Sequence, residues 1–332
     1  MESLRAVFVA SVLWSSFIAS GFGQNSAAAM HAAPGSIPSE LTRLDQGAAL
    51  NPMKIAQLKW YISNSHTLFP VGSQPLGVCF DGENIWVANY GDNTVSKIRA
   101  SDGAPQGRFT VPAQPTGLAF DGANIWVTSS SLNEVTKLRA SDGKTLGNFP
   151  TGKVPWWPAF DGQNIWTPNG DGTVSKIRAS DGTTLGTFTA GSGPIAVAFD
   201  GQNVWVTNYG GGNVTELRAS DGTVLRTVTT GTGPLGIAFD GANMWVANRG
   251  SASVTKIRTS DGTVLGNFTV PISPYGIAFD GFYLWVAGAV NNSVVRASDG
   301  ALVGQWHNDN TAGVAFDGAH IWIANQNTVT KY

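Results

Sequence analysis

The sequence has few of the residues from which catalytic and metal-binding sites are usually built. It contains one cysteine and four histidines in 332 residues. A single cysteine excludes an internal disulfide bond and a cysteine-cluster metal site. No two histidines share a repeat unit at ligand spacing, so there is little material for histidine catalysis. We therefore expect no catalytic residue, no metal ligand set and no cofactor.

Charge is also scarce. Charged residues make up 13% of the chain, about half the usual ~25%, and the net charge is −2. This balance gives no electrostatic drive toward nucleic acid or an anionic membrane. At 42% hydrophobic residues the chain can still bury a core. What is abundant is glycine, with 41 residues, and tryptophan, with 12.

The first part of the chain divides into three segments ahead of a large domain. Residues 1–23 have the pattern of an export signal, with Arg5 before an apolar stretch and small residues that offer cleavage sites after Gly23 or within 27–29. We expect an exported protein, periplasmic or extracellular, with no membrane span once the signal is removed; an uncleaved anchor is the alternative. Residues 24–50 read as a flexible linker. Residues 51–62 are predicted to form a short helix, because Asn51 is a good cap and Pro52 suits the first helical position.

Residues 63–332 consist of one unit repeated seven times. The tripeptide Phe-Asp-Gly recurs at steps of 40, 40, 39, 40, 40 and 37 residues, and a tryptophan follows six residues after each of its phenylalanines. These tryptophans are Trp86, Trp126, Trp166, Trp205, Trp245, Trp285 and Trp322. A residue type present in every unit is more often structural than catalytic, so we expect the seven tryptophans to pack between neighbouring units.

Each unit carries four β signals and no helical period. Asp-Gly pairs between β runs are strong hairpin signals, because glycine tolerates a positive φ. Four antiparallel strands per unit, repeated seven times, predict an all-β, seven-bladed β-propeller. A solenoid is the alternative, but it needs capped ends.

The two ends of the chain indicate how the ring closes. The last unit stops at Tyr332 after its third strand, and residues 66–72 resemble the missing fourth strand. We predict that this N-terminal strand completes the last blade in a 3+1 arrangement. Such closure removes the open sheet edge, and we expect a monomer. Residues 57–62 could compete as a third strand.

Two other repeated features are interpreted as structural. Cys79 stands where the other units have alanine, so we expect a small core residue and not a nucleophile. The arginines of the third strands, such as Arg99, are expected to pair with turn aspartates.

A binding site is expected where the repeats differ, on the face formed by the loops between strands two and three and between successive blades. Tyr90, Tyr209 and Arg249 lie in the former loops, and Asn208 and Asn248 precede two of them. The third unit departs most, because Trp156 and Trp157 stand between two prolines, and Tyr275 follows the proline that opens the sixth unit. The candidate ligand-binding set is therefore Trp156, Trp157, Tyr275, Tyr90, Tyr209, Arg249, Asn208 and Asn248.

Aromatic faces and amides suit an amphipathic ligand: a small molecule, a glycan or a protein segment. The alternative is that Trp157 plugs the central channel and that the tyrosines are ordinary loop residues. Asp92 and Asp171 lie in glycine-rich loops, but neither loop has enough carboxylates for calcium.

The repeat unit, written Pro-x-Gly-[Val/Ile]-Ala-Phe-Asp-Gly-x-Asn-[Ile/Val/Met]-Trp-Val-x-Asn, resembles the exported bacterial propellers of the YVTN/NHL type, and among them the virginiamycin B lyase-like group. The resemblance covers residues 66–332. It implies a seven-bladed propeller and a lyase that opens a cyclic depsipeptide with a histidine and magnesium. That histidine belongs to a Pro-His segment at the start of a blade. The corresponding segments here read Pro234-Leu235 and Pro274-Tyr275, so no catalytic residue carries over.

Three functions follow from these patterns. The first is a non-catalytic, exported propeller that binds a ligand or partner on its loop face. The alternative is a metal-dependent lyase or hydrolase of a cyclic peptide or polysaccharide, using His307, His320 or loop carboxylates. The third is a structural envelope protein.

Overall fold

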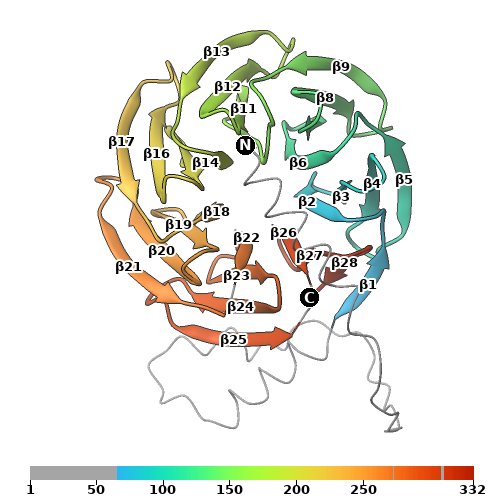
Figure 1. The fold of residues 1–332 in the computed structure, drawn as a ribbon. Helices are drawn as coiled ribbons and strands as arrows, with labels where there is room; N and C mark the ends of the chain where they lie inside the picture. The colour runs from blue at the N-terminus through green and yellow to red at the C-terminus, as the bar shows by residue number, and fades with distance from the viewer. Residues whose placement is uncertain (1–65, 272, 308–309) are drawn as a thin grey trace, which may run out of the picture. The chain divides into compact units, whose positions relative to one another are not determined.

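The computed structural model describes residues 66–271, 273–307 and 310–332, and every regular element in these ranges is a β-strand. The strands form seven four-stranded antiparallel sheets arranged as the blades of a ring (Figure 1). The predicted all-β, seven-bladed propeller is confirmed. The predicted signal, linker and short helix lie outside the described residues.

Each blade runs from an inner strand beside the ring axis to an outer strand on the rim. The inner strands are β2 (Pro75–Phe80), β6 (Pro115–Phe120), β10 (Ala159–Phe160), β14 (Pro194–Phe199), β18 (Pro234–Phe239), β22 (Pro274–Phe279) and β26 (Thr311–Phe316). The second strands are β3 (Asn84–Asn89), β7 (Asn124–Ser129), β11 (Asn164–Asn169), β15 (Asn203–Asn208), β19 (Asn243–Asn248), β23 (Tyr283–Gly288) and β27 (Ile321–Asn325).

The third and fourth strands complete the blades. The third strands are β4 (Thr94–Arg99), β8 (Glu134–Arg139), β12 (Thr173–Arg178), β16 (Asn213–Arg218), β20 (Ser253–Arg258), β24 (Asn291–Arg296) and β28 (Thr328–Lys331). The outer strands are β5 (Pro105–Thr110), β9 (Thr145–Pro150), β13 (Thr184–Thr189), β17 (Val224–Thr229), β21 (Val264–Thr269), β25 (Leu302–His307) and β1 (Thr67–Pro70).

The last blade combines the two ends of the described chain. Strand β1 pairs antiparallel with β28, with Thr67 opposite Lys331 and Pro70 opposite Thr328. The sheet order is therefore β1-β28-β27-β26, and Figure 1 shows β1 beside the C-terminal strand.

The blade tryptophans fill the junctions between blades, as predicted. Trp86 of the first blade packs with Ile125, Val127 and Leu138 of the second, and each of the other six junctions has an equivalent apolar cluster around one blade tryptophan. Six of the seven side chains are completely buried, and Trp285 is half-buried. Burial of a large flat side chain at each junction adds to the apolar area that joins successive blades.

Two polar groups that the sequence did not suggest, an aspartate and a lysine, accompany five of the seven tryptophans. In the first blade the indole Nε1 of Trp86 donates a hydrogen bond to Asp81 Oδ2 at 2.7 Å, and Lys97 Nζ lies 5.2 Å from the ring centroid. Lys97 Nζ also donates to the carbonyl oxygen of Ala140, in the next blade, at 2.7 Å. We call this hydrogen bond, from a lysine of the third strand to a backbone carbonyl of the next blade, the lysine latch. The same latch joins Lys137 to Ala179, Lys176 to Ala219, Lys256 to Ala297 and Lys331 to Ala100.

Close packing at these junctions explains a glycine in the Ser-Asp-Gly turns. Gly103 has a φ of +74°, and a side chain there would overlap the ring of Phe69 from the preceding blade. Glycine avoids both the backbone strain and the overlap.

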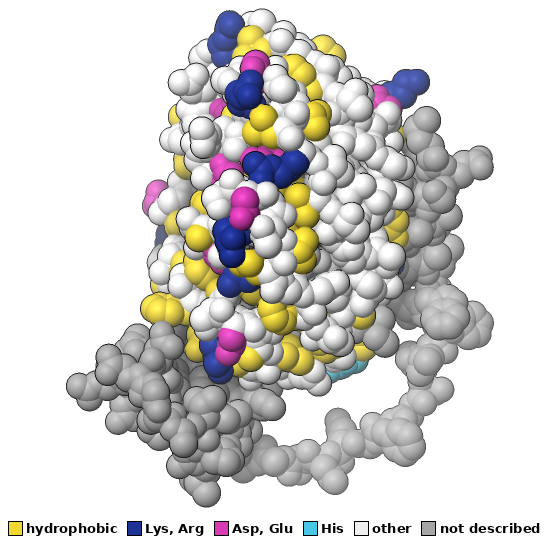
Figure 2. Space-filling view, turned by 90° about the vertical axis from the view of Figure 1, so that its left-hand side faces the viewer, with side chains coloured by type: hydrophobic (Ala, Val, Ile, Leu, Met, Phe, Trp, Pro, Cys, Tyr) yellow, Lys and Arg dark blue, Asp and Glu magenta, His cyan; other side chains and the backbone are white. Residues whose placement is uncertain are grey.

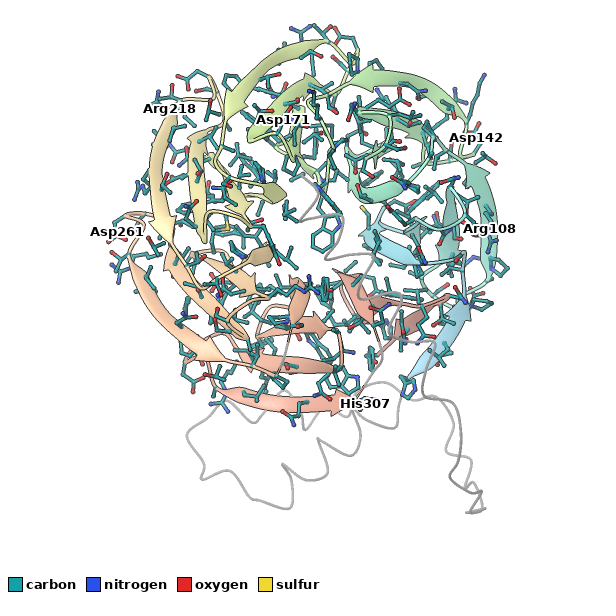
Figure 3. The ribbon with its side chains drawn as sticks, in the orientation of Figure 1. Arg108, Asp142, Asp171, Arg218, Asp261 and His307 are labelled. Carbon is teal, nitrogen blue, oxygen red and sulfur yellow. The ribbon has the colours of Figure 1, made fainter. Side chains whose placement is uncertain are left out.

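The predicted arginine–aspartate pairs are confirmed. Arg99 and Asp102 lie 2.9 Å apart across the turn between strands three and four, and five other blades repeat this ion pair. Figure 2 shows blue and magenta side chains next to one another along one side of the ring. In Figure 3, Asp142, Arg218 and Asp261 lie at the outer rim. The aspartates of the Phe-Asp-Gly turns, by contrast, accept hydrogen bonds from the blade tryptophans.

At the junction between blades four and five, four residues that form the repeated inter-blade contacts elsewhere are replaced together. Glu216 stands at the lysine position, completely buried, and its Oε2 lies 2.7 Å from Nε of Arg226. Arg226 replaces a glycine, Val228 replaces the outer-strand phenylalanine, and Thr259 replaces the alanine that receives the lysine elsewhere. Burial raises the pKa of Glu216, although the Arg226 charge acts against it.

At the junction between blades six and seven a valine takes the place of the lysine. Val294 lies opposite Trp285. Aromatic side chains fill the space: Trp306 Nε1 donates to the Tyr332 hydroxyl at 2.8 Å, and the rings of Trp306 and Trp285 are 5.7 Å apart.

Candidate functional site on the loop face

Buried asparagines form hydrogen bonds at the base of the loops between strands two and three. Asn248, the last residue of β19, is completely buried and donates through Nδ2 to Thr255 Oγ1 at 2.8 Å. Asn208, at the end of β15, likewise donates to Thr215 Oγ1 at 2.9 Å. Both amides therefore link the end of the second strand to the third strand at the base of the loop. As ligand contacts they stay predictions.

The residues that follow these asparagines belong to one continuous arc over blades four, five and six. The guanidinium carbon of Arg249 lies 4.7 Å from the ring centroid of Tyr275, which is 3% exposed. The Arg249 backbone N–H donates to the Gly233 carbonyl at 2.9 Å. A side chain at Gly233 would come within 3.1 Å of Tyr209 Cε2. We call Tyr209, Arg249 and Tyr275 the Arg249 arc.

Charge distinguishes Arg249 from the other arginines of the described residues. Each of the others has a carboxylate within ion-pair distance: Arg99, Arg108, Arg139, Arg178, Arg218, Arg226, Arg258 and Arg296. Within the same ranges Arg249 has no such partner, and its guanidinium lies over the Tyr275 ring. Its half-buried side chain is thus oriented by a ring and has no described carboxylate beside it.

Trp156 and Trp157 lie in the inner part of blade three and connect it to the neighbouring blades. The inner strand of blade three is reduced to β10, and Trp157 instead forms a parallel bridge with Ala196 of blade four. Its Nε1 donates to the Thr116 carbonyl of blade two at 3.1 Å. Trp156 is 7% exposed, and its N–H donates to the Pro168 carbonyl. The pair therefore ties three blades together, and half-buried Trp157 remains accessible in part.

Gly117 shows how closely this segment approaches its neighbour. A side-chain carbon at Gly117 would lie 2.7 Å from Trp157 Cα and 2.6 Å from Pro158 Cδ. Only glycine fits this approach without a shift of the backbone. Tyr90, the remaining predicted site residue, is half-buried in blade one, outside the Arg249 arc.

Two of the candidate catalytic groups, Asp92 and His320, have partners at turns. Asp92 accepts the Ser73 N–H through Oδ2 at 3.0 Å and the Thr94 hydroxyl through Oδ1 at 2.6 Å. His320 lies 3.4 Å from Asp317 at a turn. Burial raises the pKa of the Cys79 thiol to about 12, helped by the nearby Asp81 charge, so the thiol stays protonated and unreactive.

The residues present do not fit the magnesium that the family resemblance implies. No histidine stands in the segments that open the blades. Among the residues that the structure describes, no three histidine, cysteine, aspartate or glutamate side chains converge as a metal site.

Comparison with known proteins identifies the fold. The chain resembles a streptogramin B lyase in structure. That solved structure superposes with a TM-score of 0.68 at 19% identity, covering 80% of this chain and 96% of the other. A hydrazine synthase structure from Kuenenia stuttgartiensis gives a TM-score of 0.70 at 18% identity, covering 79% of this chain and 97% of the other. At these identities the likeness establishes the fold alone, and it confirms the fold-level resemblance predicted from the repeat.

Two other comparisons returned nothing: no protein-family profile and no curated protein sequence matches the chain. A search of the described residues for membrane-crossing helices likewise found no helix of sufficient length and apolarity.

Proposed function

We propose that this protein is an exported, non-catalytic propeller that binds a small molecule, a glycan or a protein segment on its loop face. The observation that carries the proposal is the Arg249 guanidinium, which lies over the Tyr275 ring near Tyr209 and has no carboxylate partner among the described residues. This arc combines a cation, aromatic rings and hydrogen-bonding loops. Such a combination is typical of ligand sites.

A triple variant on the loop face tests the proposal. Replacing Tyr90, Tyr209 and Arg249 by serine removes the loop side chains without entering the core, and Ser130 already occupies the same position in blade two. We expect the native protein to bind members of a glycan array or a peptide array, and the triple variant to lose that binding at least tenfold.

The matched control is a triple variant on the outer wall, with Leu146, Leu185 and Leu265 replaced by serine. These exposed side chains lie on β9, β13 and β21, so the control should bind as the native protein does. Equal binding by native protein and loop-face variant, or no binding to either array, would contradict the proposal.

The lyase or hydrolase alternative has a direct test. Incubation with cyclic depsipeptides, with and without a chelator, should leave the ring intact in our proposal. Metal-dependent ring opening would replace it with the enzyme hypothesis.

Export rests on residues 1–23. Expression of the full chain and of a variant without these residues, followed by cell fractionation, should place only the full chain outside the cytoplasm. Equal distribution of both would contradict export.

A further inference from the structure

We propose that Arg249 receives an oxyanion of the ligand, a carboxylate, sulfate or phosphate group carried by a small sugar. This inference rests on the proposed function of the loop face and narrows the class of ligand. Three independent observations lead to it: the charge of the surrounding loops, the orientation of the guanidinium and the chemistry of its neighbours.

In the described loop segments of blades four, five and six, Arg249 is the only side chain with a full charge at pH 7. These segments span residues 190–194, 209–213, 230–234, 249–253, 270–271, 273–274 and 289–292. Nothing in these segments neutralises it. The local potential is therefore positive although the chain as a whole carries −2. A positive site inside a neutral surround selects an anionic group.

The guanidinium is held in place before any ligand arrives. Backbone hydrogen bonds from Arg249 to Gly233 and from Gly250 to Thr232, both 2.9 Å, fix the loop. Buried Asn248 fixes its base, and the Tyr275 ring supports the planar guanidinium at 4.7 Å. Because little side-chain entropy is left to lose, hydrogen bonds from this group to an oxyanion are made at low cost.

The neighbouring loops offer hydrogen bonds more than apolar surface. Their sequences are dominated by glycine, serine, threonine and asparagine. Hydroxyl and amide groups around an arginine suit a molecule with several hydroxyls and one anionic group, and the arginine can bind that group through two parallel hydrogen bonds. An acidic sugar meets this description.

A matched series of probes tests the charge requirement. Glucose, glucuronate, glucose 6-sulfate and glucose 6-phosphate share one ring and differ in the group at carbon six. We expect the Arg249 Nε–Hε resonance, assigned with Arg249→Lys, to shift and saturate with at least one anionic member and to stay in place with glucose. The member that binds most tightly distinguishes carboxylate, sulfate and phosphate.

Two variants separate this proposal from a general charge effect. Arg249→Met should weaken binding of the anionic probe at least tenfold. We expect this variant to fold, because Gly170 and Ala289 occupy the same position in other blades. Arg218→Met removes the same charge from the Arg218–Asp221 turn and should leave binding unchanged. Binding that is equal in Arg249→Met and native protein, or a shift that glucose produces equally, would overturn the proposal.

Tyr275 is assigned as a positioning residue. Tyr275→Leu places there the residue of blades one and five, Leu76 and Leu235, so the fold should tolerate it. We expect a lower heteronuclear NOE at Arg249 Nε and several-fold weaker anion binding, with both restored in Tyr275→Phe. An unchanged NOE would show that the ring does not orient the guanidinium.

The outcomes also separate this inference from the proposed function. If the loop-face triple variant loses its ligand but Arg249→Met keeps it, the oxyanion assignment is wrong and the binding face stands. If the native protein binds nothing on the arrays and no glucose derivative, both fail.

Discussion

The repeated aspartate is the residue on which each blade tryptophan depends. In blade five, Trp245 is completely buried, and its indole nitrogen donates to Asp240 Oδ2 at 2.7 Å. Asp240 Oδ1 accepts two backbone N–H groups, from Ala242 at 2.9 Å and from Asn243 at 2.6 Å. One carboxylate therefore closes the first hairpin and satisfies the indole that packs against the next blade. An unsatisfied indole N–H would cost about 1–3 kcal/mol there.

Acid should destabilise the propeller through these carboxylates. Burial acts to raise the pKa of Asp121 and Asp240, but hydrogen bonds from the indole, the backbone and asparagine outweigh it and hold each pKa below its ordinary value; Asp317 behaves likewise, with His320 contributing. The unfolded chain thus binds more protons below about pH 4. The stabilisation is complete above the unfolded pKa and is lost as the pH falls through the folded values.

We therefore expect the unfolding midpoint in urea to fall steeply below about pH 4. Asp240→Asn should cost roughly 1–3 kcal/mol at pH 7 and reduce the steepness of the acid dependence. Native and variant proteins with parallel pH profiles would contradict this origin of the acid sensitivity.

Between elements, the buried lysines join one blade to the next. Lys137 Nζ, on β8, donates to the Ala179 carbonyl at 2.7 Å, and its side chain is 8% exposed. It lies 5.1 Å from the Trp126 ring centroid, so the ring faces a cation that is itself hydrogen-bonded. Loss of this group leaves the Ala179 carbonyl without its donor.

Lys137→Met keeps the apolar stem but removes the ammonium group. We expect a loss of about 2 kcal/mol in the free energy of unfolding, because a charge-assisted hydrogen bond is removed at a buried site. The control is Lys144→Met, at an exposed turn of the same blade, which should change stability by less than about 0.5 kcal/mol. Equal effects in the two variants would show that the latch adds nothing.

The junction of blades four and five shows that such contacts change as a set. Glu216→Lys alone restores the residue of five other blades but places a second cation against Arg226. Because the buried ion pair is lost, we expect a destabilisation of about 3 kcal/mol. Adding Arg226→Gly, Val228→Phe and Thr259→Ala rebuilds the junction seen elsewhere and should recover most of the loss, as measured by calorimetry. A quadruple variant no more stable than Glu216→Lys would contradict this coupling.

At the scale of the whole molecule, the ring is closed by a blade that combines the first and last described strands, β1 and β28. Phe69 of β1 lies 5.4 Å from the Trp322 ring and packs on Gly103 of blade one. Strand β1 also covers β28, which would otherwise present an unpaired edge to solvent. We call the junction between the last blade and blade one the seam. It repeats the contacts of an internal junction, but its outer strand, β1, has only four residues.

Phe69→Ala should open this seam. We expect a loss of roughly 2–4 kcal/mol, rapid proteolysis near residues 66–70 and a concentration-dependent tendency to associate through β28. Phe109→Ala, the equivalent change in blade one, should cost a similar amount without exposing residues 66–70. Limited proteolysis followed by mass spectrometry distinguishes the two, and identical cleavage patterns would contradict a special role for the seam.

The sequence by itself determined the number of blades, the order of their strands and the place of the tryptophans. These features depend on local spacing: an Asp-Gly turn sets a hairpin within a few residues, and seven equal copies can bury their shared face only by packing on one another. The pairing of Arg99 with Asp102 is equally local, three residues along the chain. The candidate loop residues could also be chosen because they break the repeat.

Only the tertiary structure decided which of these residues meet. Lys97 and Ala140 are 43 residues apart, and Arg249 reaches Tyr275 from a neighbouring blade, so neither contact leaves a trace in local spacing. The buried states of Asn208, Asn248 and Trp156 were missed for the same reason: exposure depends on how adjacent blades approach. The charge of Arg249 points to a binding site because every other described arginine lies beside a carboxylate. Which charged side chains lie beside one another depends on the folded structure and not on local sequence spacing.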